Sequence, residues 1–157
     1  MIIGIDTGKT GAICALKDPQ NFFVMDTPKD LESLDEIETF VKHVTGYYGE
    51  VTAIYVEEQY VSRTDGGTQI LAYGRIAGIV IGIFKYIFQS AKLVEVHPRT
   101  WKAFFKVSAD KKESLTFIER VYKVDTKIFF GKKGGFKDGR VDAYLIAVYG
   151  YNKEGGK

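Results

Sequence analysis

The run of residues 51–56 is continuously apolar or β-branched, which is the pattern of a strand buried on both faces of a sheet. Such strands occur in parallel or mixed sheets whose two faces are covered by helices. Other short apolar runs bounded by turn residues, at 1–6, 12–16, 21–25 and 92–97, predict four more strands. We therefore expect an α/β sandwich around a central mixed sheet, with antiparallel strands first and parallel strands after them.

The longer segments between and after these strands have the residue spacing of helices. Ser33 and Glu36 form a capping-box pattern at the start of the first of them. Helices are predicted at residues 33–44, 70–88, 99–107, 110–122 and 140–151. The length of 157 residues suits one domain, which we place at residues 1–151, followed by a flexible tail at 152–157.

The most apolar helical segment, residues 70–88, is a candidate for a membrane span. Arg75 and Lys85 interrupt it and leave residues 76–84 as the longest uncharged stretch, well short of the ~20 residues that a bilayer needs. We predict a buried helix instead. A glycine recurs every four residues along it, at Gly74, Gly78 and Gly82. This stripe permits close packing either on the chain's own sheet or on a partner helix.

Cysteine usage and the first residues bear on the compartment. Cys14 is the only cysteine, so an intramolecular disulfide is impossible, and no Cys/His cluster has the spacing of a zinc site. Residues 1–6 lack the basic segment of a signal peptide and include Asp6. We expect a cytoplasmic protein that is not exported.

Charge is distributed unevenly along the chain. Residues 26–58 contain nine acidic and two basic residues, a net charge of −7, while the whole chain carries +2. The remaining residues therefore carry +9. A positive surface outside an acidic helix suits a nucleic-acid backbone, although this asymmetry alone is a weak indication.

Acidic residues stand at the ends of predicted buried elements, where an unpaired charge is costly. They are Asp6, Glu57 or Glu58, and the pair Asp138 and Asp142 at the start of the last helix. Oxygen ligands from separate elements, without His or Cys, are what Mg²⁺ or Mn²⁺ requires. Two such ions about 3.5 to 4 Å apart can activate water and stabilise both oxygens in phosphodiester cleavage. Each carboxylate alone could equally cap a turn or lie in solvent, and the combination indicates a nuclease.

Four stretches resemble the ordered motifs of RuvC-type Holliday-junction resolvases, particularly their phage-like branch. They are IIGIDTGKTGAICAL around Asp6, IYVEEQYV around Glu57, ADKKES at residues 109–114 and KDGRVDAYLIA at residues 137–147. The resemblance covers nearly the whole chain. It implies a ribonuclease-H-like fold and a homodimer that nicks two opposing strands of a four-way or branched DNA junction. It also implies two Mg²⁺ ions per active site, replaceable by Mn²⁺, and a phage-encoded protein acting in a bacterial host.

The metal ligands implied by this resemblance are Asp6, Glu57, Asp138 and Asp142. Typical bacterial members space the last acidic pair by three residues, whereas here the spacing is four and Gly139 takes the three-residue position. Both spacings share one helix face. Glu57 and Glu58 each fit the family glutamate, and since they point to opposite faces of a strand only one can be a ligand. We choose Glu57.

Basic residues beside the scissile phosphate are also implied by the resemblance. Lys102 in VHPRTWKAFF and Lys111 in SADKKES match these positions and could neutralise charge in the transition state, with Lys112 as a close rival to Lys111. Tyr60 and Arg63 match the region that meets the junction centre, where they could stack on unpaired bases.

A basic, glycine-rich loop interleaved with phenylalanines precedes the last helix, and we expect it to bind the DNA backbone. The predicted DNA-binding residues are Tyr60, Arg63, Lys112, Lys132, Lys133, Lys137 and Arg140.

Three other functions compete with junction resolution. GIDTGKTGA also resembles the phosphate loop of actin-like and sugar-kinase ATPases, but that fold needs two such domains and the chain has room for one. A ribonuclease-H-like nuclease acting on RNA is the second alternative, and a junction-binding module without catalysis is the third. The complete carboxylate set argues against the third.

Overall fold

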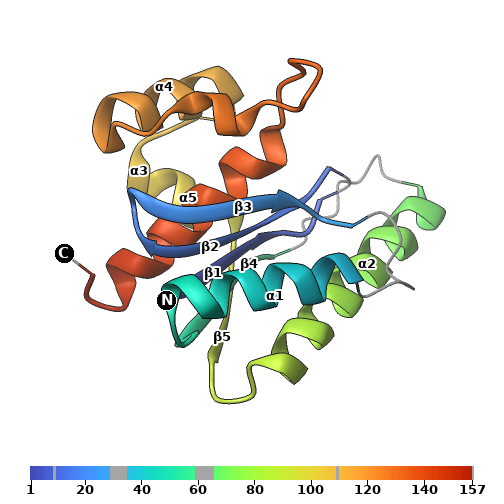
Figure 1. The fold of residues 1–157 in the computed structure, drawn as a ribbon. Coiled ribbons are helices and arrows are strands. Elements are labelled where there is room, and N and C mark those ends of the chain that lie inside the picture. Colours follow the sequence, from blue (N-terminus) through green and yellow to red (C-terminus); the bar gives the residue numbers. More distant parts are fainter. Residues whose placement is uncertain (9, 29–34, 59–65, 109, 157) are drawn as a thin grey trace.

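The central sheet has five strands in the order β3-β2-β1-β4-β5 (Figure 1). This computed structural model describes residues 1–8, 10–28, 35–58, 66–108 and 110–156. The strands are β1 (Ile2–Asp6), β2 (Ala12–Asp18), β3 (Asn21–Asp26), β4 (Ala53–Glu57) and β5 (Lys92–Val96). β1, β2 and β3 pair antiparallel, and β1, β4 and β5 pair parallel. The predicted mixed sheet, antiparallel first and parallel after, is confirmed.

Helices cover both faces of this sheet, as the buried strand pattern predicts. They are α1 (Asp35–Tyr48), α2 (Gly67–Ile87), α3 (Pro98–Phe105), α4 (Lys111–Tyr122), the short 3₁₀ helix η1 (Thr126–Phe129) and α5 (Asp138–Lys153). α1 and α2 pack on one face. α5 crosses the other face, with α3, α4 and η1 around it (Figure 1). Ser33, which belongs to the predicted capping box, lies outside the described residues.

Strand alternation decides which side chains face α5. Along β1, Ile3 and Ile5 belong to the core under α1 and α2, whereas Ile2 belongs to the core under α5. Gly4 also lies under α5, so closely that a Cβ added to it would be 2.4 Å from the backbone nitrogen of Ala147. Asp6 has the same parity as these two residues and therefore ends β1 on the α5 face.

Helix α2 is not the buried helix that its apolar composition predicts. Val80 and Phe84 pack into the core, but Leu71 is 76% exposed and Tyr86 is 77% exposed. A Cβ added at any of the three striped glycines, Gly74, Gly78 and Gly82, would meet no described residue within 4 Å. By length and composition alone, Ile70–Ile87 would suffice to cross a membrane, with 17% of that window buried. Among the described residues, one stripe of the helix packs toward the sheet, and the glycine stripe lies on the other, exposed side.

The beginning of the predicted flexible tail is ordered. α5 continues to Lys153, and the carboxylate of Glu154 accepts hydrogen bonds from Tyr55 Oη at 2.7 Å and Lys92 Nζ at 2.9 Å. The donors lie on β4 and β5, about 60 to 100 residues away in sequence. Local composition therefore indicated fraying, and only the packing of α5 against the sheet brings these partners together.

Candidate active site

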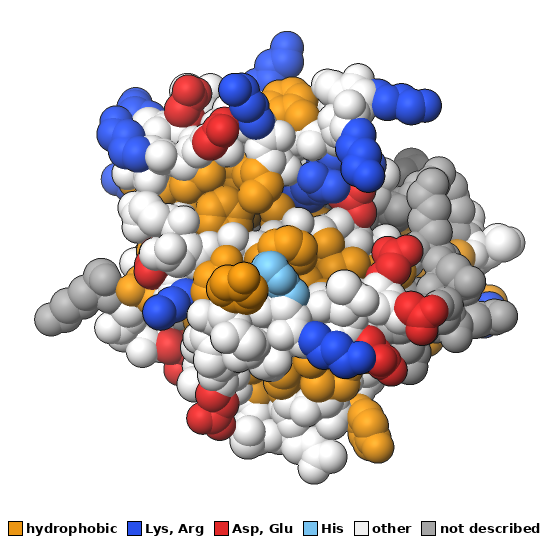
Figure 2. All heavy atoms as spheres, in the orientation of Figure 1, with side chains coloured by type: hydrophobic (Ala, Val, Ile, Leu, Met, Phe, Trp, Pro, Cys, Tyr) orange, Lys and Arg blue, Asp and Glu red, His pale blue; other side chains and the backbone are white. Residues whose placement is uncertain are grey.

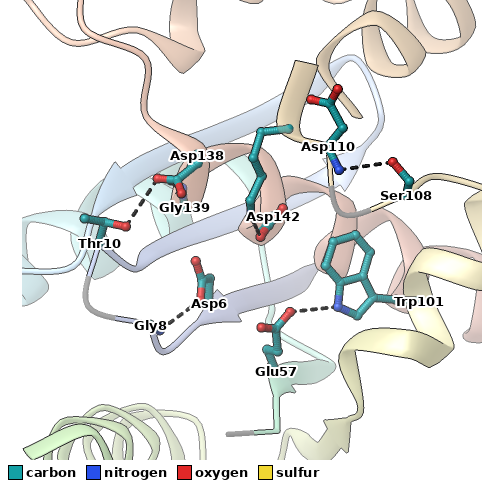
Figure 3. Close-up of polar contacts among 11 residues, drawn as sticks. Asp6, Gly8, Thr10, Glu57, Trp101, Ser108, Asp110, Asp138, Gly139 and Asp142 are labelled. Carbon is teal, nitrogen blue, oxygen red and sulfur yellow. Dashed lines mark hydrogen bonds and ion pairs between the residues drawn. The ribbon is translucent and has the colours of Figure 1, made fainter. Parts of the chain in front are cut away.

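Two carboxylates end neighbouring parallel strands on the same face of the sheet. Ile5 of β1 is in register with Val56 of β4, so Asp6 and Glu57 occupy equivalent places at the carboxyl ends of these strands. Figure 3 shows the side chains of Asp6 and Glu57 on the α5 side of the sheet. Asp6 is buried and Glu57 is half-buried, whereas the next residue, Glu58, is exposed. Strand parity therefore directs Glu57, and not Glu58, toward Asp6.

Asp142 brings a third carboxylate to this place from α5. Its side chain is buried, and its Oδ2 forms an ion pair with Lys111 Nζ at the start of α4. Its Oδ1 is buried and has no hydrogen-bond partner among the described residues. A buried carboxylate oxygen without a partner is costly in a closed core. Such an oxygen is suited to be a ligand of a hard cation such as Mg²⁺.

The acidity of the site reflects this burial. Burial raises the pKa of Asp6 to about 7; the charges of Glu57 and Asp142 add to the effect, and a hydrogen bond from the backbone N–H of Gly8 opposes it. Burial likewise raises the pKa of Glu57, against a hydrogen bond from Trp101. Ionised carboxylates are therefore disfavoured here until a cation compensates them.

Lys111 is the lysine that the structure places among the carboxylates. The side chain of Asp110 caps α4 by accepting from the backbone N–H of Lys112, and Lys112 itself is exposed. Burial lowers the pKa of Lys111, but the ion pair with Asp142 and the charges of Asp138 and Asp6 together outweigh it, and the pKa is raised. Lys102 lies nearby, with Nζ 5.0 Å from the centre of the Trp101 ring and its charge favouring the ionised form of Glu57.

Asp138 lies at the edge of this group, at the first turn of α5. Its Oδ1 accepts from Thr10 Oγ1 at 3.2 Å and from the backbone N–H of Gly139 at 3.0 Å. A Cβ added to Gly139 would lie 2.0 Å from the carbonyl oxygen of Thr10 and 3.1 Å from Asp6 Oδ2. Position 139, three residues before Asp142, therefore has no room for a side chain unless the backbone of Thr10 moves.

The carboxylates approach one another without enclosing a metal-sized space. Within the described ranges, no three His, Cys, Asp or Glu side chains are arranged closely enough to hold an ion. Mutual repulsion of carboxylates and the ion pair between Lys111 and Asp142 are sufficient physical reasons for this spacing. The donor set, all oxygen and drawn from three separate elements, fits Mg²⁺ or Mn²⁺.

The basic loop before α5 is an ordered hairpin. Phe130 and Phe136 form an antiparallel bridge with their rings 5.5 Å apart, and Gly131 N–H donates to the carbonyl of Gly135 at 2.8 Å. Lys132 and Lys133, at the tip between them, are exposed. In Figure 2 cationic side chains gather over this hairpin and over α4, where acidic side chains also lie among them, and further acidic side chains lie over the start of α1.

Two other residues predicted to bind DNA form ion pairs within the chain. Lys137 Nζ lies 3.0 Å from one carboxylate oxygen of Asp26, and Arg140 Nε lies 2.6 Å from the other. Arg140 also donates to the carbonyl of Ile128 at 3.0 Å. These two residues tie the hairpin and α5 to β3. Tyr60 and Arg63 lie outside the described residues.

Trp101 is the site residue that sequence reasoning overlooked. It is the chain's single tryptophan, it is fully buried, and its Nε1 donates to Glu57 Oε2 at 2.9 Å (Figure 3). A signal was available, because a buried indole N–H needs an acceptor and this one stands beside Lys102 in the motif VHPRTWKAFF.

Comparison with solved structures identifies the architecture. Thermus thermophilus RuvC in complex with a Holliday-junction substrate matches with a TM-score of 0.61 and 18% identity over 99% of this chain and 96% of that one. Another Thermus thermophilus RuvC structure matches with a TM-score of 0.57 at the same identity and coverage. The chain has a ribonuclease-H-like fold. The yeast mitochondrial Holliday-junction resolvase Ydc2 matches with a TM-score of 0.54 and 14% identity over 94% of this chain and 75% of that one. No family model and no curated protein matches the sequence.

Proposed function

We propose that this protein is a metal-dependent DNA endonuclease that resolves four-way junctions by nicking two opposing strands. The observation that carries the proposal is the position of Asp6, Glu57 and Asp142 on the α5 side of the sheet, near enough for their charges to interact, with Asp142 Oδ1 buried and without a partner among the described residues. The fold adds support, since one structural neighbour is described as bound to a Holliday-junction substrate. The basic hairpin and α4 beside the carboxylates supply a surface for phosphates (Figure 2).

Asp6, Glu57 and Asp142 would hold Mg²⁺ in this site, with Asp138 at its edge. When bound, such ions supply an activated water and stabilise both reacting oxygens of the phosphodiester. The chain's own residues do the rest: α5 excludes solvent from the buried side of the carboxylates, and Gly8 N–H fixes one oxygen of Asp6 at 2.8 Å. Lys102 and Lys111 place positive charge where the scissile phosphate would lie.

The decisive experiment compares cleavage of end-labelled four-way junction, linear duplex and RNA–DNA hybrid, each with Mg²⁺ and with chelator. We expect symmetric nicks in the four-way junction when Mg²⁺ is present, and no cleavage in the presence of chelator. Preferred cutting of the hybrid would replace this proposal with a ribonuclease-H-type activity. Tight junction binding without cleavage under Mg²⁺ and Mn²⁺ would indicate a binding module.

We propose further that the functional form is a two-fold homodimer paired through α2. A junction presents two equivalent strands, and an isologous interface places two sites symmetrically. The outer face of α2 supports this, because Leu71 and Tyr86 are exposed and no described residue covers the glycine stripe. An apolar helix face of this kind, not covered by the chain itself, fits an interface between two copies.

Substituting Gly78 with Leu should weaken this dimer by roughly 5- to 150-fold, since overpacking a close contact costs ~1 to 3 kcal/mol. The measurement is sedimentation equilibrium of wild type and Gly78→Leu at micromolar concentration, with folding checked by circular dichroism. Gly46→Leu is a matched control, because Gly46 lies on α1 and its added Cβ would likewise meet nothing within 4 Å. A monomeric wild type that makes both nicks within one junction encounter would contradict the dimer.

Removing the two lysines at the hairpin tip should weaken junction binding equally for all sequences and reduce its salt dependence. Each phosphate contact contributes about 0.9 to the slope of log K against log salt concentration, so Lys132→Ala with Lys133→Ala should flatten the slope by up to about 2. Lys137 is left intact because it pairs with Asp26. Lys42→Ala, on the acidic helix α1, is the control and should leave the slope unchanged. An unchanged slope in the double variant would place the hairpin away from DNA.

A further inference from the structure

We infer that Trp101 is a positioning residue that orients the Glu57 carboxylate for metal binding through its indole N–H. The inference rests on the proposed metal-dependent activity for its purpose. Its geometric basis is the 2.9 Å hydrogen bond from Trp101 Nε1 to Glu57 Oε2.

The local fold fixes this contact from both sides. Glu57 ends β4 in register with Val96 of β5, and the backbone N–H of Glu58 donates to the carbonyl of Val96 at 2.9 Å. After Val96 the chain enters α3 directly, with His97 as the N-cap of this helix and Pro98 at its first position. Trp101, one turn later, is therefore placed against the end of β4 by a short, hydrogen-bonded connection.

The indole has a single donor and no acceptor, so its N–H has one possible use in the core. The ring itself is fully buried, which leaves it little freedom to rotate. A hydrogen bond to one carboxylate oxygen selects one rotation of the Glu57 carboxylate and leaves Oε1 for a ligand. Hydrogen bonding to the ionised form also opposes the effect of burial on this carboxylate.

The same ring also places a positive charge. Lys102, the next residue of α3, has its Nζ 5.0 Å from the centre of the Trp101 ring. Ammonium groups are attracted to the face of an indole. Trp101 thus holds a carboxylate at its edge and an ammonium over its face, which are the two charges that a metal ion and a phosphate would meet.

The chain's only tryptophan makes this arrangement directly observable. Titrating wild type with Mg²⁺ should change the tryptophan emission in a saturable way, and Mn²⁺ should quench it. Glu57→Gln should reduce both responses, whereas Glu58→Gln, the exposed neighbour, should leave them as in wild type. Emission that stays constant while calorimetry detects Mn²⁺ binding would overturn the inference.

Substitution separates the N–H from the bulk of the ring. Replacing Trp101 with 3-benzothienylalanine, which keeps the ring shape and lacks the N–H, should weaken Mn²⁺ binding in calorimetry by roughly 10- to 100-fold, the usual effect of losing a ligand's hydrogen-bond partner. Junction affinity should be unchanged, so any loss of cleavage should appear in kcat. Trp101→Phe should behave alike if it folds. Phe105→Leu, a buried packing change on the same helix, should leave the Mn²⁺ affinity near that of wild type.

A double-mutant cycle completes the test. In the Glu57→Gln background the benzothienylalanine replacement should cost no further Mn²⁺ affinity, because the carboxylate it orients is gone. Equal losses in both backgrounds, or a benzothienylalanine protein with wild-type affinity, would reduce Trp101 to a packing role. These readouts need no DNA, so they hold even if junction cleavage fails and the proposed function falls.

Discussion

Replacing Asp142 with Asn is expected to lower kcat for junction cleavage by about 10²- to 10³-fold or more, the scale of losing one preorganised electrostatic group. The isosteric amide removes the charge that a metal ion requires, at a buried position whose Oδ1 has no other partner among the described residues. Junction affinity should change little, because it depends mainly on contacts from Lys and Arg to phosphates. Single-turnover cleavage and a binding titration of the same protein preparation measure the two effects.

Asp6→Asn and Glu57→Gln should behave in the same way, and Glu58→Gln provides the matched control. Glu58 follows Glu57 directly but is exposed, so its neutralisation should leave kcat within a few-fold of wild type. If Glu58→Gln loses cleavage and Glu57→Gln retains it, the assignment of the glutamate ligand is wrong. If Asp6→Asn cleaves normally, the assignment of the metal site to these carboxylates is wrong.

The second large effect is on stability: without metal, the free energy of unfolding should fall by up to about 4 kcal/mol as the pH rises from about 4 to 7. A pKa raised from 3.8 to about 7 at Asp6 corresponds to this amount. The direction follows from the ionised form. In the unfolded chain the Asp6 carboxyl ionises near pH 4 and is solvated by water. In the folded chain the same carboxyl stays neutral until about pH 7. The stabilising effect is therefore present at low pH and is lost as the pH approaches 7.

Denaturant unfolding in chelator across this pH range tests the effect. Asp6→Asn should flatten the pH dependence, and Mg²⁺ should restore stability to wild type near neutral pH while doing little for Asp6→Asn. The raised pKa of Glu57 acts in the same direction as that of Asp6. The raised pKa of Lys111 affects only the alkaline range, where its contribution is lost as the pH rises through the folded value. A wild-type stability that is constant from pH 4 to 7 would contradict the burial of an uncompensated Asp6.

The sequence by itself determined the order and type of nearly every strand and helix. Short β-branched runs and helical spacing are local signals, and a strand that is apolar on both faces can only be buried between layers. The same reasoning found the acidic residues at the ends of β1 and β4, because a charge that follows a buried run stands at the edge of the core. The sequence patterns did not predict the short helix η1 or the helical residues after 151, since both depend on contacts with distant elements.

Tertiary structure determined the direction in which these side chains point and the partners that they meet. It turned Lys111 toward Asp142 and left Lys112 exposed, because helix α4 begins where Asp110 caps it. It assigned Lys137 and Arg140 to Asp26, since charges far apart in sequence pair once β3 and α5 are neighbours.

Packing also determined which surfaces remain open. It left the apolar outer face of α2 uncovered, although composition alone predicted a buried helix. It also placed the indole N–H of Trp101 within hydrogen-bonding distance of the Glu57 carboxylate. A sequence fixes which residues are apolar, charged or able to donate, whereas the packing of the folded chain fixes which of them meet.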